Sequence, residues 1–396
     1  MNILIYRYGS ICEPDVITGF QALGNQVSEI TAEIYNKNLS PSEGVTLLKN
    51  ELLTHSYDFV FSINFFPFIS EVCNIFQIRY ICQTVDSPVM ELYSNSIYNP
   101  WNRIFMFDKA QYDEFSPKNP AGIFHLPLAS NPTRWESVIN NATPSQIDRY
   151  SGDVSFVGSL YTEKSTYRRL KNAPDYLTGY LDGIMAGQQK IYGYDFLEEV
   201  LPESIVTDFR KYFTGFYTAP EESFCTDRAT LAQLYLGTEI SARERVDTMK
   251  LLGSHYHVDL YTGSDTSGLP VQNKGLVKTL TEMPIIFHYS KINLNITAKS
   301  IRSGLPLRIF DILGCGGFCL TNYQPELSDY FTIGSDLECY TDEKNLLDKV
   351  SYYLSHEKER AQIAHNGFET VKKYHNYPER LLQMLSLAYG IKEDTL

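Results

Sequence analysis

The chain has 396 residues, 43% of them hydrophobic, and a formal net charge of −13. That length exceeds one typical core and predicts two domains. The charge excludes a nucleic-acid backbone as the main partner, because such affinity comes mostly from Lys and Arg, and the sequence contains no apolar run long enough for a transmembrane helix.

The first part of the chain alternates apolar strands with helical stretches, which is typical of a parallel sheet with crossover helices. The opening apolar residues have no charged leader, so they are interpreted as a strand rather than a signal peptide. Helical spacing covers residues 16–23 and 45–53. Strands are predicted at residues 3–6, 59–63, 80–84, 104–107 and 123–126. A stretch rich in Asn, Pro, Ser and Thr, residues 131–151, is the predicted linker.

A second alternating unit begins with a strand at 153–158 and is followed by a largely helical stretch, residues 166–252. Further strands are predicted at 258–261, 292–296 and 318–321, and the end of the chain is helical. The pattern predicts two similar α/β halves with a cleft between them. The expected domains are residues 1–145, residues 146–375 with the helical insertion, and residues 376–396, a C-terminal helix that crosses back to the first domain.

Residues 301–326 combine a loop, a short helix, a glycine turn, a buried strand and a second helix start. Arg308 and Asp311 are three residues apart and therefore share a helix face. Arg308 can neutralise a phosphate, and Asp311 can accept two hydroxyl hydrogens from a ribose. The alternative is an ion pair on the helix surface. The glycines at 314–317 are interpreted as a helix-to-strand turn.

Other candidates for a ligand carrying phosphates and hydroxyls lie beside predicted strands. Gly158 and Ser159 end a strand where the backbone can approach phosphate closely, and Lys164 follows. Lys291 could neutralise a leaving phosphate. The remaining donor-side candidates are Tyr289, Asn293, Asn295, Asn322, Gln324 and Glu326. Glu326 either holds sugar hydroxyls or only favours the N-terminus of its own helix.

In the first half, the acceptor-side candidates are Tyr8, Gly9 and Asp86 in loops after predicted strands and His125 within the strand at 123–126. A carboxylate at Asp86 can act as a general base, or it is a turn residue before Pro88. His125 is more often a satisfied core residue. Doubly wound sheets bind ligands in these loops, at the carboxyl ends of their strands.

Several motifs are missing. The sequence has no D-x-D triplet, no G-x-G-x-x-G fingerprint, no G-x-S-x-G elbow and no P-loop. We therefore expect neither metal nor cofactor, and a diphosphate would be held by Arg, Lys and helix amides. The seven cysteines are scattered, mostly in apolar runs, which is typical of reduced thiols in a cytoplasmic protein.

These residues resemble a known family, the CgeB-like (spore maturation protein) glycosyltransferases of the GT-B fold. The resemblance rests on Gly304, Pro306, Arg308, Phe310 and Asp311, on the following Cys-Gly-Gly-Phe turn, and on residues 321–326. It extends to residues 289–295 and 156–158 and, in the first half, to residues 85–88 and 125–129.

The resemblance implies two Rossmann-like domains facing each other across a cleft, with a nucleotide-sugar donor in the second half and a protein or glycan acceptor in the first. A metal-independent hexosyltransferase using a UDP-sugar is the expected activity, with Asp86, Lys291 and Arg308 as catalytic candidates. In the broader retaining group, an E-x7-E motif contacts the donor. Its second acid falls on Asp311 but its first on Gly304, so the stereochemical outcome is left open.

Two alternatives share the implied fold: a non-catalytic protein that binds nucleotide sugars or glycans, and a sugar-nucleotide epimerase. The sugar, the acceptor and any homo-oligomeric state are left open by the sequence.

Overall fold

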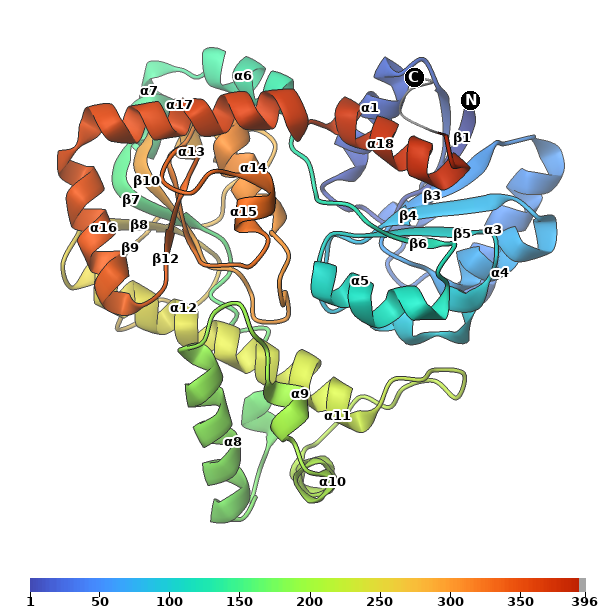
Figure 1. The fold of residues 1–396 in the computed structure, drawn as a ribbon, viewed down its shortest axis with the longest axis horizontal. Helices are drawn as coiled ribbons and strands as arrows, with labels where there is room; N and C mark the ends of the chain where they lie inside the picture. Colours follow the sequence, from blue (N-terminus) through green and yellow to red (C-terminus); the bar gives the residue numbers. More distant parts are fainter. Residues whose placement is uncertain (392–396) are drawn as a thin grey trace. The chain divides into compact units, whose positions relative to one another are not determined.

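The computed structural model describes residues 1–391, which form two compact units. Unit 1 comprises Met1–Ala129, Ala219–Cys225 and the chain from Tyr374 onward. Unit 2 comprises Ser130–Thr218 and Thr226–Lys373. Each unit contains one six-stranded sheet, in which every strand pairing is parallel (Figure 1). The predicted class, two α/β domains with a helical insertion in the second, is confirmed.

The strand order in unit 1 is β2-β1-β3-β4-β5-β6. Its strands are β1 (Asn2–Tyr6), β2 (Gln26–Ile30), β3 (Phe59–Ile63), β4 (Arg79–Gln83), β5 (Asn102–Met106) and β6 (Ile123–His125). In this unit sequence analysis missed only β2, because this edge strand is largely exposed and its residues, Gln-Val-Ser-Glu-Ile, carry little apolar signal.

The helices of unit 1 are α1 (Glu13–Ala22), α2 (Ala32–Tyr35), α3 (Pro41–Thr54), α4 (Pro67–Phe76), α5 (Lys109–Phe115) and α18 (Tyr377–Tyr389), with short 3-10 turns at Met90–Tyr93, Asn95–Tyr98 and Ser116–Lys118. The last helix, α18, packs on α1, where Gly19 leaves room for Leu381. Residues 219–225 also belong to this unit, and Phe224 packs on Tyr93 with ring centroids 5.4 Å apart.

The strand order in unit 2 is β12-β11-β10-β7-β8-β9. Its strands are β7 (Gly152–Val157), β8 (Val258–Tyr261), β9 (Gln272–Asn273), β10 (Ser290–Asn295), β11 (Cys319–Asn322) and β12 (Glu338–Tyr340). Its helices are α6 (Pro132–Asn140), α7 (Pro144–Tyr150), α8 (Asp175–Gln189), α9 (Leu197–Val200), α10 (Glu203–Tyr212), α11 (Asp227–Ala229), α12 (Gly237–Gly253), α13 (Met283–Tyr289), α14 (Leu307–Gly314), α15 (Leu327–Tyr330), α16 (Glu343–Ser355) and α17 (Glu357–Tyr374), with a 3-10 turn at Tyr167–Arg169 and a π-helical segment at Thr230–Leu236.

The predicted linker at 131–151 is wrong, because these residues form α6 and α7 and pack on α13 in unit 2. The polar residues that resembled a linker are helix caps. Asn131 accepts a hydrogen bond from the Arg134 amide, and Thr143 forms a capping box with Gln146. The two units accordingly divide after Ala129 rather than near residue 145.

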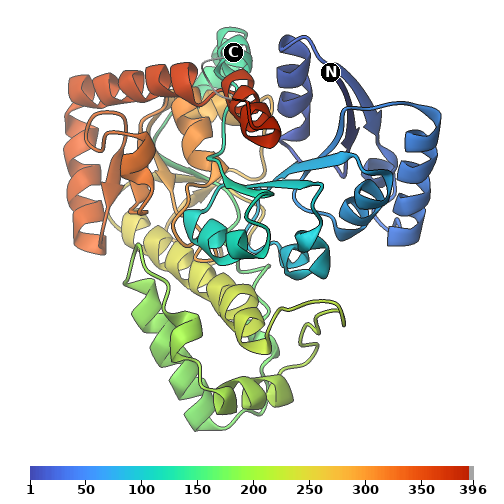
Figure 2. The ribbon, with the colours of Figure 1, turned by 45° about the vertical axis from the view of Figure 1, so that its right-hand side comes forward.

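The helical insertion of unit 2 has a core of its own. Phe209, Phe213 and Tyr235 stack at its centre, with ring centroids 4.6–5.7 Å apart. In Figures 1 and 2 its green helices lie away from the sheet of unit 2, and the end of α8 meets the middle of α12, where Gln189 donates to Asp247. The π-helical segment runs directly into α12, so the insertion is joined to the helix that precedes β8.

Within residues 1–391, no helix has both the length and the apolar character needed to cross a membrane.

Both sheets reverse their strand order, between β1 and β3 in unit 1 and between β7 and β10 in unit 2. The loops that leave two such neighbouring strands run in opposite directions, which opens a crevice at the carboxyl edge of the sheet. The strand order therefore marks one candidate ligand edge in each unit.

Buried thiols and phenols make stability depend on pH. Burial raises the pKa of Cys73, Cys82 and Cys319, and also that of Tyr192 and Tyr340. In the unfolded chain these groups titrate at about 8.5 and about 10. The unfolded state then releases protons that the folded state keeps, so stability is full below pH 8 and falls as pH rises.

We expect the free energy of unfolding to fall above about pH 8.5 by up to about 1.4 kcal/mol per pH unit for each such group. Guanidinium titrations at pH values between 7 and 10.5 measure how the free energy of unfolding changes with pH. Cys82→Ala should make that change smaller by the contribution of one titrating group. A stability that stays constant up to pH 10.5 would contradict the prediction.

Candidate functional site

Arg245 lies at the centre of the carboxyl edge of unit 2. Its guanidinium, carried by α12, donates to the carbonyl of Ser159 after β7 and to that of Ile296 after β10, both at 2.7 Å. The side chain is buried, which lowers its pKa, and it lies over the Tyr161 ring at 4.1 Å. Arg245 therefore ties together the two loops that diverge at the point of strand reversal.

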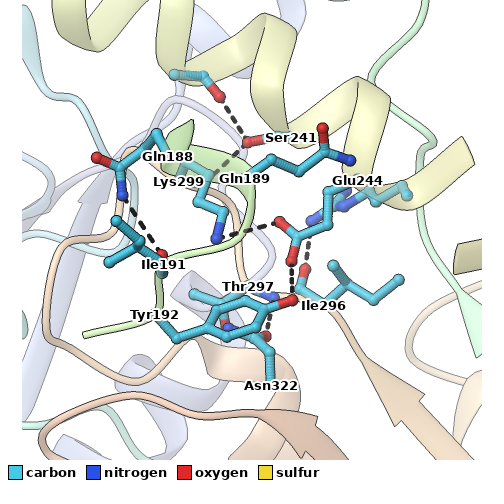
Figure 3. A network of polar contacts seen from close by, with 12 residues as sticks. Gln188, Gln189, Ile191, Tyr192, Ser241, Glu244, Ile296, Thr297, Lys299 and Asn322 are labelled. Atoms are coloured by element: carbon cyan, nitrogen blue, oxygen red, sulfur yellow. Dashed lines mark hydrogen bonds and ion pairs between the residues drawn. The ribbon is translucent and has the colours of Figure 1, made fainter. Parts of the chain in front are cut away.

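A second buried cation, Lys299, lies in the loop after β10 (Figure 3). Its Nζ is 3.4 Å from Oε2 of Glu244 and 4.1 Å from the centroid of the Tyr192 ring. Tyr192 donates its hydroxyl hydrogen to Oε1 of Glu244 at 2.6 Å. Burial lowers the pKa of Lys299, while the carboxylate of Glu244 raises it. The Lys299 backbone amide donates to Ser241 Oγ at 2.9 Å, which fixes the loop on α12.

The polar residues after β11 hold the loops that surround them. Asn322 Oδ1 accepts from the Thr297 amide at 2.7 Å, and Gln324 donates to the carbonyls of Ile301 and Gly304 at 3.2 and 3.3 Å. Glu326 accepts from the Ser303 hydroxyl at 2.8 Å. All three are buried, so the predicted donor residues Asn322, Gln324 and Glu326 build the loop that precedes α14.

The structure does not bring Asn293 and Asn295 to a ligand surface. Asn293 is fully buried and bonds to Ser155 and to the carbonyls of Phe287 and Phe318. Asn295 donates to Thr321 Oγ1 at 2.8 Å. Their amides satisfy polar groups inside the sheet, and the assignment of these two residues to donor contact is corrected accordingly.

Tyr289 and Lys291 lie at the wrong end of the sheet for a site at the carboxyl edge. Tyr289 ends α13, and Lys291 is the second residue of β10, where it pairs with Asp153 at 2.7 Å. Residues 289–291 precede the body of β10, so they lie at the amino end of the sheet and not at its carboxyl edge. We remove both residues from the candidate site, and Lys291 from the catalytic candidates.

Arg308 and Asp311 occupy the first two turns of α14, which begins in the loop after β10. The Arg308 guanidinium is 3.8 Å from Asp311, bonds to the sulfur of Met283 and lies 5.4 Å from the Phe287 ring centroid. Its side chain keeps 29% of its surface exposed, so it can meet a ligand. Asp311 is buried and accepts from Ser130 Oγ at 3.3 Å. A ribose would have to displace that hydroxyl.

The loop after β7 carries Gly158, Ser159 and Lys164, as expected from the sequence. Ser159 donates its hydroxyl to Glu163 at 2.6 Å, while its carbonyl is held by Arg245. Lys164 is exposed, and its Nζ lies 4.2 Å from the Tyr161 ring centroid. Lys164 is exposed and the Arg308 side chain is partly exposed, so both can meet a ligand.

At the carboxyl edge of unit 1, the structure brings Tyr8 and Asp86 together through Asn64. The Asn64 amide donates to Asp86 Oδ2 at 2.7 Å and to the Tyr8 hydroxyl at 3.0 Å, and its Oδ1 accepts from the Val85 amide at 2.9 Å. Asn64 adopts a left-handed backbone (φ 58°), as Asn does more readily than most residues. Asp86 is exposed, with one oxygen oriented by this contact.

The remaining unit 1 candidates are arranged differently. Gly9 has φ 96° and donates its amide to Glu13 at 3.0 Å, so this glycine serves a turn that a side chain would strain. His125 ends the edge strand β6, two strands from β4, and lies near the Tyr112 ring. The structure does not bring His125 into the Tyr8–Asn64–Asp86 group.

Sequence reasoning missed Arg245, Glu244, Lys299, Tyr192 and Asn64. Arg245 lies 86 residues from one of its partners and within a stretch that shows only helical periodicity. The position of Lys299 just after a predicted strand was an available signal.

Comparison with known proteins supports a glycosyltransferase. Residues 238–386 match a family described as glycosyl transferase-like. No curated protein sequence matches the chain.

Three solved structures share the fold over 99% of this chain. They are a glycosyltransferase from Rickettsia africae (9% identity, TM-score 0.54, 99% of its chain), Anabaena Alr3699/HepE in complex with UDP-glucose (10%, 0.55, 100%) and the trehalose-6-phosphate synthase OtsA (9%, 0.58, 100%). At such low identities the likeness concerns the fold, which confirms the predicted GT-B architecture. The match of residues 238–386 to the glycosyl transferase-like family confirms the predicted enzyme class, and the CgeB-like subfamily stays a prediction.

Arg245 is expected to be the main stabilising contact of this edge. Arg245→Met removes the donor to the buried Ile296 carbonyl and to the partly buried Ser159 carbonyl and should lower the free energy of unfolding by about 2–4 kcal/mol. Arg243→Met, two residues earlier on the same helix, removes only half-exposed ion pairs with Glu239 and Asp182 and should cost less than about 1 kcal/mol. Chemical denaturation measures both, and equal losses would contradict the special role of Arg245.

Proposed function

We propose that the chain transfers a hexose from a UDP-sugar to a protein or glycan acceptor, without a metal ion. The match of residues 238–386 to the glycosyl transferase-like family carries the proposal, because that range contains Arg245, Lys299, Arg308 and the loop they surround. The fold shared with HepE, whose structure holds UDP-glucose, supports a UDP-linked donor. The CgeB-like resemblance remains our proposal for the subfamily.

The donor diphosphate would bind at the carboxyl edge of unit 2. The amide groups at the N-terminus of α14 and the partly exposed guanidinium of Arg308 lie on one side, and exposed Lys164 lies in the loop after β7. These groups stabilise the negative charge that develops on a leaving diphosphate. Arg245, Asn322, Gln324 and Glu326 keep the loops in place, and Asp311 is the proposed ribose acceptor.

No metal is assigned to this site. Among residues 1–391, no group of three His, Cys, Asp or Glu side chains is placed to hold a metal ion. Metal independence is part of this proposal. So is a cytoplasmic location, which the scattered, reduced cysteines favour.

On unit 1, Asp86 would accept the proton of the acceptor hydroxyl in an inverting transfer. Its carboxylate is exposed and oriented by Asn64, so it can approach a hydroxyl group. In a retaining transfer the leaving phosphate would take that proton, and Asp86 would only bind the acceptor.

A thermal-shift screen of the full chain tests the donor. UDP and one UDP-sugar at 100 times their Kd should stabilise the folded state by about 2.7 kcal/mol and raise Tm accordingly. Asp311→Ala should reduce the shift. Failure of UDP, GDP, ADP and their sugars to change Tm would overturn the donor proposal, and full donor affinity in Asp311→Ala would remove the ribose assignment.

Asp86→Asn tests the base. Asn keeps an oxygen for the Asn64 contact but cannot take a proton, so we expect kcat for sugar transfer to fall about 10²–10⁴-fold while UDP affinity stays unchanged. Asp113→Asn, an exposed acid on α5, should leave both unchanged. A loss of kcat below tenfold would show that Asp86 is not the base and favour the retaining route.

A further inference from the structure

Unit 2 has a cavity with a volume of 460 Å³ whose lining does not include Arg308 or the loop that precedes α14. It lies between α12 and the start of α16 and is closed by the end of α8 and by the following residues up to Tyr192. That volume is within the range of about 300–1,000 Å³ typical of small-molecule sites. The helical insertion supplies one wall, so the cavity depends on the part of unit 2 that lies outside its sheet.

One buried polar atom in the wall, the hydroxyl of Tyr340, has no hydrogen-bond partner among residues 1–391, and Oε2 of Glu244 has only the ion pair with Lys299 at 3.4 Å. Tyr340 is 2% exposed and Glu244 is 3% exposed. Leaving a buried hydroxyl unsatisfied costs about 1–3 kcal/mol, so the unpaired Tyr340 oxygen in the cavity wall points to a ligand group that would pair with it.

The wall also contains an aromatic corner. The rings of Tyr192 and Tyr340 meet edge to face, with centroids 6.1 Å apart and an interplanar angle of 87°. Figure 3 shows Tyr192 beside Glu244, with Gln189 nearby. Gln189 donates to Asp247 at 3.0 Å, which places an amide and a carboxylate at the mouth. Apolar ring surface beside carboxylate and amide oxygens suits a ligand with C–H faces and hydroxyl edges.

The charges of the cavity nearly cancel. The charge of Glu244 is balanced by Lys299, which lies outside the cavity. At the rim, two positive side chains offset most of the charge of three acids: Lys190 and Lys344 face Asp247, Asp342 and Glu343. The wall contains no arginine, and its carboxylates would repel a phosphate. A neutral ligand that accepts and donates hydrogen bonds therefore fits better than a nucleotide or a simple ion.

We propose that this cavity is a saccharide-binding site, distinct from the donor site, in which a neutral sugar pairs with the Tyr340 hydroxyl and with Glu244. The ligand is either a free sugar or one unit of a glycan chain, since both present the same hydroxyl groups. The inference goes beyond the proposed transfer reaction and does not depend on it.

Saturation-transfer NMR and calorimetry on the full chain test the site, with glucose, maltose and sucrose as free sugars and dextran as a chain. We expect at least one of them to bind at tens of millimolar or below, equally well with and without saturating UDP. Tighter binding of dextran identifies the ligand as one unit of a glycan chain, and tighter binding of a free sugar identifies it as a free sugar. Absence of binding by all four, or displacement by UDP, overturns the proposal.

Two variants locate the binding. Tyr340→Phe removes only the unpaired hydroxyl, so the fold is kept, and the affinity should fall about three- to tenfold. Ala186→Trp fills the mouth from an exposed position of α8 and should abolish binding. The matched control is Tyr261→Phe, which removes another buried, unpaired hydroxyl of unit 2 outside this cavity. Wild-type sugar affinity in Tyr340→Phe together with Ala186→Trp would overturn the assignment.

Discussion

Two hydrogen bonds from one guanidinium hold the carboxyl edge of unit 2 together. Where the strand order reverses, the loops after β7 and β10 run apart, and their backbone carbonyls face a crevice without strand partners. Arg245 satisfies a carbonyl on each side, at 2.7 Å. Such bonds from a charged donor contribute about 1.5–3 kcal/mol each, which exceeds the contribution of any exposed ion pair nearby. Glu244, the residue before Arg245 on α12, pairs with Lys299 of the loop after β10 at 3.4 Å, so neighbouring residues of α12 hold the same loop.

The polar residues of this edge fall into two groups. Asn322, Gln324 and Glu326 have their hydrogen bonds committed to the loop before α14, whereas Arg308 and Lys164 keep exposed charge. Buried residues of the first group hold the loop rigid, and the second group remains available to a ligand. A site preorganised in this way spends little free energy on ordering when the ligand binds.

A polar residue next to a predicted strand proved to be at the ligand edge only where it followed the strand rather than preceded it. Asp86 and Tyr8 follow their strands, and the structure brings them together through Asn64. Lys291 is at the amino end of its strand and therefore lies away from the edge. Asn293, inside the same strand, bonds to Ser155 of the neighbouring strand. The Asn293 side chain forms hydrogen bonds inside the sheet, so its polarity does not indicate a ligand.

The sequence by itself determined most strands of the two parallel sheets and the helical insertion, because the periodicity of apolar residues is a local pattern, and the GT-B class was implied by the family resemblance. The short helix of α14 and the buried strand β11 were also predictable from their own residues. Only the tertiary structure decided that α6 and α7 belong to unit 2, that Arg245 ties two loops, and that Tyr340 and Glu244 share a cavity. The two partners of Arg245, for example, lie 51 and 86 positions away in the sequence. No local sequence pattern encodes partners at such separations.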